Sequence, residues 1–157
     1  MDDNANILSD AWQTTQSVYA IGSGGLFGVG LGQSRQKYSY LGNAHTDFIF
    51  SSVGENLGML GCMLVMLLLT IVIIHCARVG LRSGRTFDML ICIGVAATVA
   101  AQTFINIGMC IGITPVIGIT LPFFSYGGSS MATMFAAMGL VSGTMFKPKP
   151  QHFSLMY

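Results

Sequence analysis

Residues 57–77 read LGMLGCMLVMLLLTIVIIHCA, a run in which His75 is the only ionisable side chain besides two cysteines. A helix needs roughly 20 apolar residues to cross a hydrocarbon layer of about 30 Å. The run is therefore long enough to span a membrane. It predicts a transmembrane helix over about 57–77, which could extend backwards through FIFSSVGEN at 48–56.

Two further segments are long and apolar enough to form membrane-spanning helices. They are about 87–112, FDMLICIGVAATVAAQTFINIGMCIG, and about 127–146, GGSSMATMFAAMGLVSGTMF. Hydrophobic residues make up 52% of the 157-residue chain and charged residues only 8%, whereas about 25% of residues are charged in a soluble domain. The sequence therefore predicts an all-α polytopic membrane protein with three transmembrane helices.

The positions of the basic residues predict how these helices are oriented. Cytoplasmic loops of membrane proteins carry an excess of Lys and Arg. Such residues occur in the first loop, RVGLRSGR, and in the tail, KPKPQHF, whereas the second loop carries no charge. They are Arg78, Arg82, Arg85, Lys147 and Lys149. We therefore expect the first loop and the C-terminus in the cytoplasm, with the 113–126 loop and the residues before about 50 outside.

Three regions follow from this topology. They are an extracellular loop region at 1–47, a three-span region at 48–146 and a cytoplasmic tail at 147–157. An external region of this length has to be exported, and residues 1–17 lack the basic and apolar segments of a signal peptide. We therefore expect the chain to be the C-terminal part of a longer polytopic protein, with Met1 an artificial or misassigned start.

The region before the first span contains a glycine-rich segment, AIGSGGLFGVGLGQS at 20–34. It does not fit the dinucleotide-binding pattern G-x-G-x-x-G, because Phe27 and Gln33 occupy the place of the third glycine. Glycine permits irregular backbone conformations, so we expect a re-entrant or surface-lying segment. The apolar loop at 113–128 is expected to dip into the membrane interface or the helix bundle.

Small and polar residues in and beside the spans predict contacts between helices. GxxxG spacings let helix backbones approach closely in a membrane. They occur at Gly54/Gly58, Gly108/Gly112 and Gly139/Gly143. Gln102 and Asn106 lie one turn apart and should face protein rather than lipid. The four cysteines form no CxxC pair and are interpreted as small packing residues.

Asp47, in HTDFIF at 45–50, is an acidic residue at the boundary of the first span. Carboxylates at a membrane boundary are functional hypotheses by default, and Asp47 is a candidate general base or cation ligand. The alternative is a structural role, in which Asp47 stabilises the N-terminus of the helix by capping and through the helix dipole. Thr46 is an equally good candidate for the cap, so both interpretations stay open at this point.

Glu55 follows Asp47 by eight residues, which is about 12 Å of rise if residues 47–58 are helical. Paired glycosidase carboxylates lie roughly 5–9.5 Å apart, so Asp47 and Glu55 are not expected to form such a pair. A role of Glu55 in ordering a polar network, or in meeting a partner outside this chain, is favoured. His45 has no second metal-ligating residue at a suitable spacing and is interpreted as an orienting or solvated loop residue.

Three more residues are candidates for substrate binding outside the membrane. Arg35 and Lys37 can meet a phosphate-bearing substrate at the surface, or they are ordinary interfacial charges. In the motif SYGGSS, which begins at Ser125, hydroxyls and backbone amides can bind an anion. Capping of the third helix by Ser129 or Ser130 is the other interpretation.

Together these residues predict a site on the outer side of the membrane that combines a carboxylate, a glycine-rich segment and two cationic side chains. An enzyme acting on a lipid-linked substrate fits this combination, and so does a transporter with a coupling carboxylate. The chain has no basic stripe with interleaved aromatic residues, so nucleic acid is not an expected partner.

Several long motifs resemble the SEDS family (shape, elongation, division and sporulation) of the FtsW/RodA/SpoVE type. They are QSVYAIGSGGLFGVGLGQS, AHTDFIFSSVGENLG, NIGMCIGITPVIGITLPFFSYGGSS and the basic tail. The resemblance covers nearly the whole chain from Gln13 onward. It implies that the three spans are the last three of a roughly ten-span bundle, joined to the large extracellular loop that precedes them.

The resemblance also implies a function. The complete protein would be a peptidoglycan glycosyltransferase of the bacterial cytoplasmic membrane, which polymerises lipid II (an undecaprenyl-pyrophosphate-linked disaccharide peptide) during cell elongation, division or sporulation. It would work with a class B penicillin-binding protein. Asp47 stands at the position regarded as catalytic in the family, where it would deprotonate the acceptor sugar hydroxyl or hold a divalent cation, Mg or Mn. No organic cofactor is implied.

Alternatives to this function remain at the level of the sequence. The chain could belong to a lipid II flippase or transporter, or to a non-catalytic membrane scaffold for cell-wall synthesis. Because the front of the implied bundle would supply much of the substrate cavity, the fragment alone is expected to be inactive.

Overall fold

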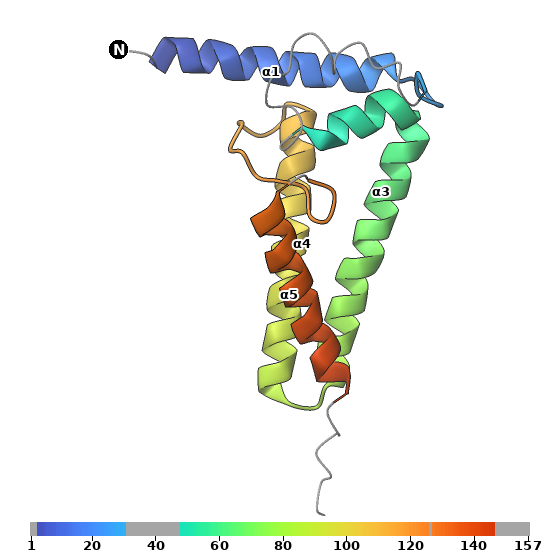
Figure 1. Ribbon diagram of the computed structural model, residues 1–157, viewed down its shortest axis with the longest axis vertical. Helices are drawn as coiled ribbons and strands as arrows, with labels where there is room; N and C mark the ends of the chain where they lie inside the picture. Colours follow the sequence, from blue (N-terminus) through green and yellow to red (C-terminus); the bar gives the residue numbers. More distant parts are fainter. Residues whose placement is uncertain (1–2, 31–47, 126, 147–157) are drawn as a thin grey trace, which may run out of the picture.

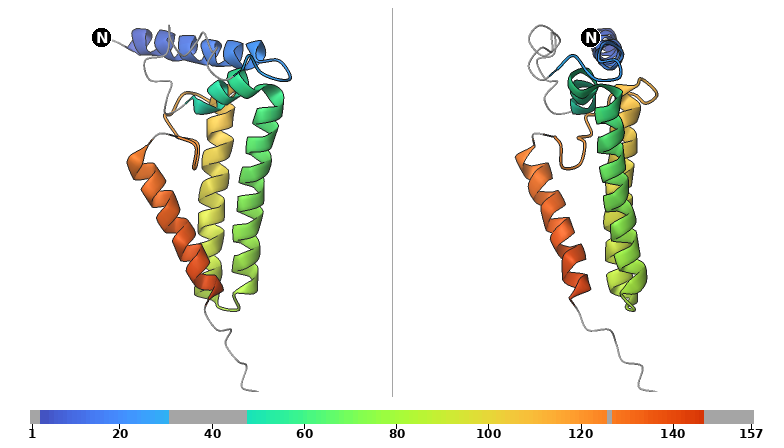
Figure 2. Two further views of the ribbon diagram at one scale, coloured as in Figure 1. Left: turned by 45° about the vertical axis from the view of Figure 1, so that its right-hand side comes forward. Right: turned by 90° about the vertical axis from the view of Figure 1, so that its right-hand side faces the viewer.

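The computed structural model describes residues 3–30, 48–125 and 127–146, and these residues form four helices without a strand. The helices are α1 (Asp3–Ser23), α3 (Ile49–Arg82), α4 (Thr86–Cys110) and α5 (Gly128–Met145). Figure 1 shows α1 lying across one end of a bundle formed by the other three. α3 and α4 run antiparallel, and Figure 2 shows α5 approaching them at the far end while diverging from them near α1.

The three predicted spans correspond to α3, α4 and α5. α3 includes the backward extension through residues 49–56 that the sequence allowed, and the other two helices begin and end within two residues of their predicted bounds. Among the described residues, α3 and α4 are long and apolar enough to cross a membrane. α5 is less apolar, because Gly, Ser and Thr make up eight of its 18 residues. The all-helical architecture agrees with a membrane protein.

α1 is a helix that the sequence analysis did not predict, since it treated residues 1–47 as a loop region. Its sequence is polar and lacks a strong apolar stripe, so the helix depends on packing against the rest of the molecule. Ser17 and Ala20 are buried where α1 crosses α3 and α4. The Ser17 hydroxyl donates to the carbonyl oxygen of Cys110 at 2.7 Å and lies 2.6 Å from the Ser51 hydroxyl. These two contacts tie α1 to both neighbouring helices.

The glycines of the three GxxxG motifs differ in backbone conformation and in what lies close to them. Gly54 does allow close approach, because a Cβ there would lie 3.1 Å from the Ile21 side chain of α1. Gly58 and Gly112 instead have positive φ angles of 68° and 77°, and each interrupts or ends a helix. Neither glycine of the α5 motif has another described atom close to where its Cβ would stand. Gly112 still lies close to α1, because a Cβ there would be 3.2 Å from the Thr14 side chain. Helix packing by the α5 motif stays a prediction.

The loop that follows α4 folds back against the bundle. Gly112 adopts the left-handed conformation of a Schellman cap, in which the amides of Gly112 and Ile113 donate to the carbonyl oxygens of Met109 and Gly108. Asn106 is fully buried and donates to the carbonyl oxygen of Ile119 at 2.6 Å. Its predicted contact with protein is confirmed. The predicted entry of this loop into the bundle is also confirmed, because Leu121 lies in the core.

Two clusters form the interior of the bundle. The cluster near α1 contains Phe48, Phe50, Cys62, Val65, Leu69, Cys110 and Leu121. The cluster at the far end contains Cys76, Cys92, Ala96 and Val141. All four cysteines are free thiols in buried positions, which confirms their interpretation as small packing residues.

Candidate functional site

Three segments that carry the sequence motifs meet at the α1 end of the bundle, which we call the loop end. They are residues 24–30, the start of α3 at residues 48–58, and residues 111–125 after α4. The opposite end contains the α3–α4 turn and the last turn of α5 (Figure 1). The two groups of segments that the charge pattern assigns to opposite sides of a membrane therefore lie at opposite ends of the helices.

A break in α3 is the central feature of the loop end. At Gly58 the backbone has φ 68° and ψ −164°, which is not helical. The first part of α3 therefore lies below α1 in Figure 1, and the helix then turns to run along the bundle. Such a break leaves backbone amides and carbonyls without helical partners, and buried groups of this kind are costly if they stay unsatisfied.

The glycine-rich loop at residues 24–30 supplies these missing partners. The amides of Val29 and Gly30 donate to the carbonyl oxygens of Glu55 and Asn56 at 3.0 and 3.3 Å. On the other side of the break, the amides of Met59 and Leu60 donate to the carbonyl oxygens of Gly25 and Leu26 at 2.9 and 3.4 Å. The loop thus caps both halves of the interrupted helix.

This pairing requires glycine on both sides. A Cβ on Gly58 would lie 2.7 Å from the carbonyl oxygen of Leu26, and φ at Gly58 is in a region that L-residues rarely adopt. Gly28 also has a positive φ, and a Cβ there would lie 2.5 Å from the backbone carbon of Asn56. The glycine-rich segment is evident in the sequence but its partner is not, since the only signal is a second cluster of glycines at 54–61.

Glu55 lies in the last turn before the break and is 5% exposed. Its carbonyl oxygen is held by Val29, while no described residue donates a hydrogen bond to its carboxylate. Burying a carboxylate is costly unless a hydrogen bond or a cation compensates. The expectation that Glu55 meets a polar partner beyond the described contacts stays a prediction.

Asp47 and the other candidates before it, Arg35, Lys37, His45 and Thr46, lie outside the described residues. The residue directly after Asp47 is placed, because Phe48 is 3% exposed and packs in the core with Leu121. Phe48 is also the N-cap residue of α3, and its carbonyl oxygen accepts from the amides of Ser51 and Ser52. The structural interpretation of Thr46 and Asp47 lies outside the described residues and stays a prediction.

Ser125 is buried in the segment that leads into α5. It lines a small pocket together with Gln102 of α4 and Ser130 of α5. Gly127, and not a serine, is the N-cap of α5. The prediction that Ser129 or Ser130 caps this helix is therefore wrong, and the Ser130 hydroxyl instead donates back to the carbonyl oxygen of Gly127 at 3.0 Å.

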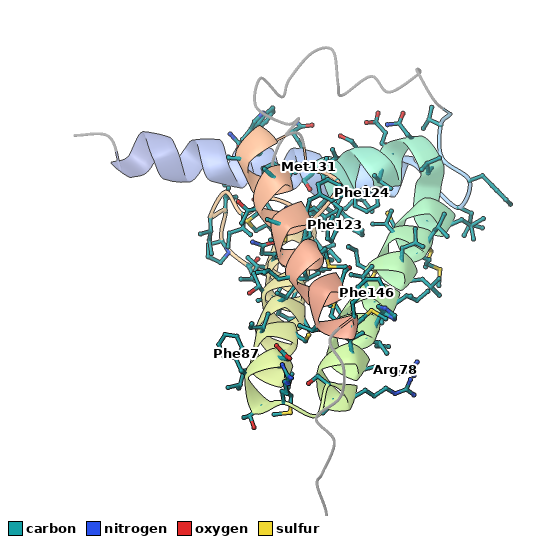
Figure 3. The ribbon with its side chains drawn as sticks, turned by 60° about the horizontal axis from the view of Figure 1, so that its bottom comes forward. Arg78, Phe87, Phe123, Phe124, Met131 and Phe146 are labelled. Atoms are coloured by element: carbon teal, nitrogen blue, oxygen red, sulfur yellow. The ribbon has the colours of Figure 1, made fainter. Side chains whose placement is uncertain are left out.

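Phe123, two residues before Ser125, is the only non-glycine residue with a positive φ, at 65°, among those described. Its ring packs edge-on against Phe135 of α5, with a distance of 6.0 Å between ring centroids. Figure 3 shows Phe123 and Phe124 beside the start of α5, near Met131. Strained backbone of this type persists only where the surroundings hold it in place. The contact with Phe135 is one of the surroundings that hold Phe123 in this conformation.

A divalent cation has no complete site among the placed side chains. Nowhere in residues 11–30, 48–125 and 127–146 do three or more His, Cys, Asp or Glu side chains lie close enough to hold a metal ion. The cation expected from the resemblance would need Asp47 and ligands outside these residues.

Comparison with known proteins places the motifs in a family. Residues 1–147 match the FtsW/RodA/SpoVE family, described as cell cycle proteins. Stage V sporulation protein E of Bacillus subtilis is 46% identical over 134 residues, which cover 85% of this chain and 37% of that protein. The probable peptidoglycan glycosyltransferase FtsW of the same organism is 44% identical over 134 residues, which cover 85% of this chain and 33% of that protein.

A solved structure shares the fold. It comes from a peptidoglycan synthase complex described as coordinating polymerization and crosslinking. It matches this chain with a TM-score of 0.66 and 31% sequence identity. The match covers 82% of this chain and 35% of that one. The chain thus spans about a third of the length of the proteins that it matches.

Proposed function

Because this chain belongs to the FtsW/RodA/SpoVE family, we propose that it forms part of a peptidoglycan glycosyltransferase that polymerises lipid II. Relatives named probable peptidoglycan glycosyltransferase FtsW support the reaction type. The observation that carries the proposal is the loop end itself. There the glycine-rich loop, the residue after Asp47 and the Ser125 segment come together, joined by backbone hydrogen bonds and a shared core.

The proposed arrangement in the membrane uses α3, α4 and α5 as three spans, with the loop end outside the cell. Gly58 and Arg78 mark the two boundaries of the first span, since the helix between Met59 and Arg78 rises about 29 Å and a hydrocarbon core is about 30 Å thick. Arg78, Arg82 and Arg85 then lie on the cytoplasmic side. This orientation places the loop end where a lipid-linked sugar on the outer face can reach it.

In the proposed reaction, Asp47 acts as the general base. It takes the proton of the acceptor sugar hydroxyl, whose oxygen bonds to the anomeric carbon of the donor sugar. Undecaprenyl pyrophosphate leaves with the electron pair of the broken bond. General-base assistance of this kind contributes typically about 10²–10⁴-fold to a rate. Support comes from Phe48, since its burial and its backbone hydrogen bonds hold the chain firmly beside position 47.

The other candidates have binding roles in this proposal. Arg35 and Lys37 bind the pyrophosphate through charge-assisted hydrogen bonds from their guanidinium and ammonium groups. Glu55 orients His45, Thr46 or a basic group that lines the substrate-binding site. A hydrogen bond or ion pair with one of these groups would relieve the free-energy cost of burying the Glu55 carboxylate. Ser125 contributes a hydroxyl at the rim. A divalent cation held by Asp47 would supply charge compensation for the pyrophosphate, and the proton transfer does not require it.

The proposed partner is a class B penicillin-binding protein, which crosslinks the strands that the polymerase makes. The similar fold within a peptidoglycan synthase complex supports this pairing. The proposed site of action is the bacterial cytoplasmic membrane.

A reconstitution experiment tests the proposed function. The complete protein is placed in liposomes with its penicillin-binding partner and labelled lipid II, with and without Mg²⁺ or Mn²⁺, and the products are sized on a gel. We expect glycan strands longer than the substrate. Translocation of lipid II without any longer product would instead identify a flippase, and partner binding with neither outcome would identify a scaffold.

A further inference from the structure

A second pocket lies at the end of the bundle opposite the loop end. Its volume is about 350 Å³, and it opens where the last turns of α3 meet the end of α5. The side chains that line it are His75, Arg78, Val79, Arg82, Ser83, Thr144 and Met145. Nothing in the proposed glycosyl transfer uses these residues, because the transfer takes place at the other end of the helices.

His75 and the two arginines of this pocket share one helix face. His75, Arg78 and Arg82 are spaced three and four residues apart in α3, and this spacing places side chains on the same side of a helix. Of the acidic residues that are placed, only Asp88 belongs to this end. Asp88 is buried and does not line the pocket. The pocket therefore presents two guanidinium groups that no carboxylate among its described lining residues neutralises.

The rest of the lining is mixed, with the polar residues Ser83 and Thr144 beside two apolar ones. Val79 faces the pocket from α3 and Met145 from α5. At the same end of the helices, although outside the pocket lining, Leu81, Phe87 and Phe146 are exposed by 70%, 71% and 88%. Figure 3 shows Arg78 and Phe146 toward this end of the molecule, with Phe87 at the start of α4. A ligand that fits has a negative head for the arginines and a hydrocarbon body for the apolar surface.

The position of the pocket along α3 agrees with such a ligand. Arg78 lies about 29 Å from Met59 along the helix, and Arg82 lies one turn, about 6 Å, beyond it. In a bilayer with a hydrocarbon core of about 30 Å and a total thickness of about 40–45 Å, Arg78 is at the edge of the hydrocarbon and Arg82 is at the depth of the phosphates. Basic pockets between membrane helices are suited to anionic lipid headgroups.

We propose that this pocket binds the phosphodiester headgroup of an anionic glycerophospholipid, with Arg78 and Arg82 as its phosphate ligands. The lipid would occupy the junction between α3 and α5, where it would contact both helices at once. The site is independent of the glycosyltransferase proposal, because it requires only that α3 crosses a bilayer.

Native mass spectrometry of the complete protein tests this site. The protein is released from detergent after incubation with phosphatidylglycerol or with phosphatidylcholine, and the bound lipids are counted. We expect R78Q/R82Q to lower the apparent affinity for phosphatidylglycerol by at least about tenfold, with phosphatidylcholine binding unchanged. R85Q is the matched control, since Arg85 carries the same charge at the same end but does not line the pocket. Equal losses in R85Q and R78Q/R82Q would overturn the site, as would no loss in either.

A measurement on the unmodified protein covers the case in which the double variant fails to fold. Phenylglyoxal labels accessible arginines, and peptide mapping reports each position. We expect nanodiscs containing phosphatidylglycerol to protect Arg78 and Arg82 several-fold more than Arg85, compared with nanodiscs of phosphatidylcholine alone. Equal labelling of all three arginines in both bilayers would contradict the proposal. Equal protection by millimolar inorganic phosphate in phosphatidylcholine nanodiscs would show a site for free anions and would overturn the lipid assignment.

Discussion

The backbone amide of Met59 donates a 2.9 Å hydrogen bond to the carbonyl oxygen of Gly25, which lies 34 residues earlier in the chain. This contact joins the second half of a broken helix to the glycine-rich loop. Together with the bond from Val29 to Glu55, it explains why the break at Gly58 is tolerated, and it would do so at the edge of a membrane in the proposed orientation. Irregular backbone at such a depth is stable only where protein or water satisfies it.

Gly58→Ala should destabilise the protein by about 1–3 kcal/mol, since the backbone at Gly58 has angles that are essentially restricted to glycine. The new methyl group would also meet the carbonyl oxygen of Leu26. The midpoint of thermal unfolding in detergent measures the effect. Gly94→Ala in α4 is the control, because Gly94 is helical and has open space around it. Equal midpoints for the two variants would show that the break is not a fixed feature.

Ser17→Ala should cost about 1–3 kcal/mol, because it leaves the carbonyl oxygen of Cys110 and the hydroxyl of Ser51 without their buried partner. The Ser17 proton goes to Cys110, so Ser51 is the donor in the bond between the two serines. A double-mutant cycle with Ser51→Ala should therefore show coupling. Thr15→Ala is the control, since the Thr15 hydroxyl is exposed and bonds within its own helix. Additive effects of the two serine variants would contradict the network.

Asn106→Ala should release the loop after α4, because the Asn106 side chain donates to the carbonyl oxygen of Ile119. Limited chymotrypsin cleavage after Phe123 or Phe124 measures this release, and we expect the variant to be cut faster by several-fold. Thr98→Ala on an exposed face of α4 should leave the rate unchanged, since its hydroxyl bonds to Gly94 of the same helix. Unchanged cleavage of the Asn106 variant would show that other contacts hold the loop.

The sequence predicted the three long helices well because their signal is local. A run of about 20 apolar residues without charge has few alternatives to a spanning helix. The polar residue Asn106 was also interpreted correctly, since a buried amide in a span needs a protein partner. These features depend on one segment at a time. The bounds of α4 and α5 lie within two residues of those predicted, whereas α3 continues five residues past its predicted end, to Arg82.

The missed features depend on pairs of segments that are distant in the chain. α1 is polar and becomes a stable element through Ser17 and Ala20, which meet α3 and α4. In the sequence, Gly58 is part of a GxxxG motif. Only its contact with the loop at residues 24–30 shows that it breaks a helix. Of the candidate site, Glu55 and Ser125 are both buried at the loop end, while the role of Asp47 stays a prediction.

Glycan polymerisation by an Asp47 variant is the most direct test of the proposed function. Asp47→Asn keeps the size of the side chain and removes its basicity, so polymerisation of lipid II by the complete protein should fall by about 10²–10⁴-fold. Its thermal unfolding midpoint, its membrane insertion and its binding to the penicillin-binding partner should match the unmodified protein. Strands of normal amount and length from Asp47→Asn, in a preparation without any other polymerase, would contradict the assignment of Asp47 as the catalytic base.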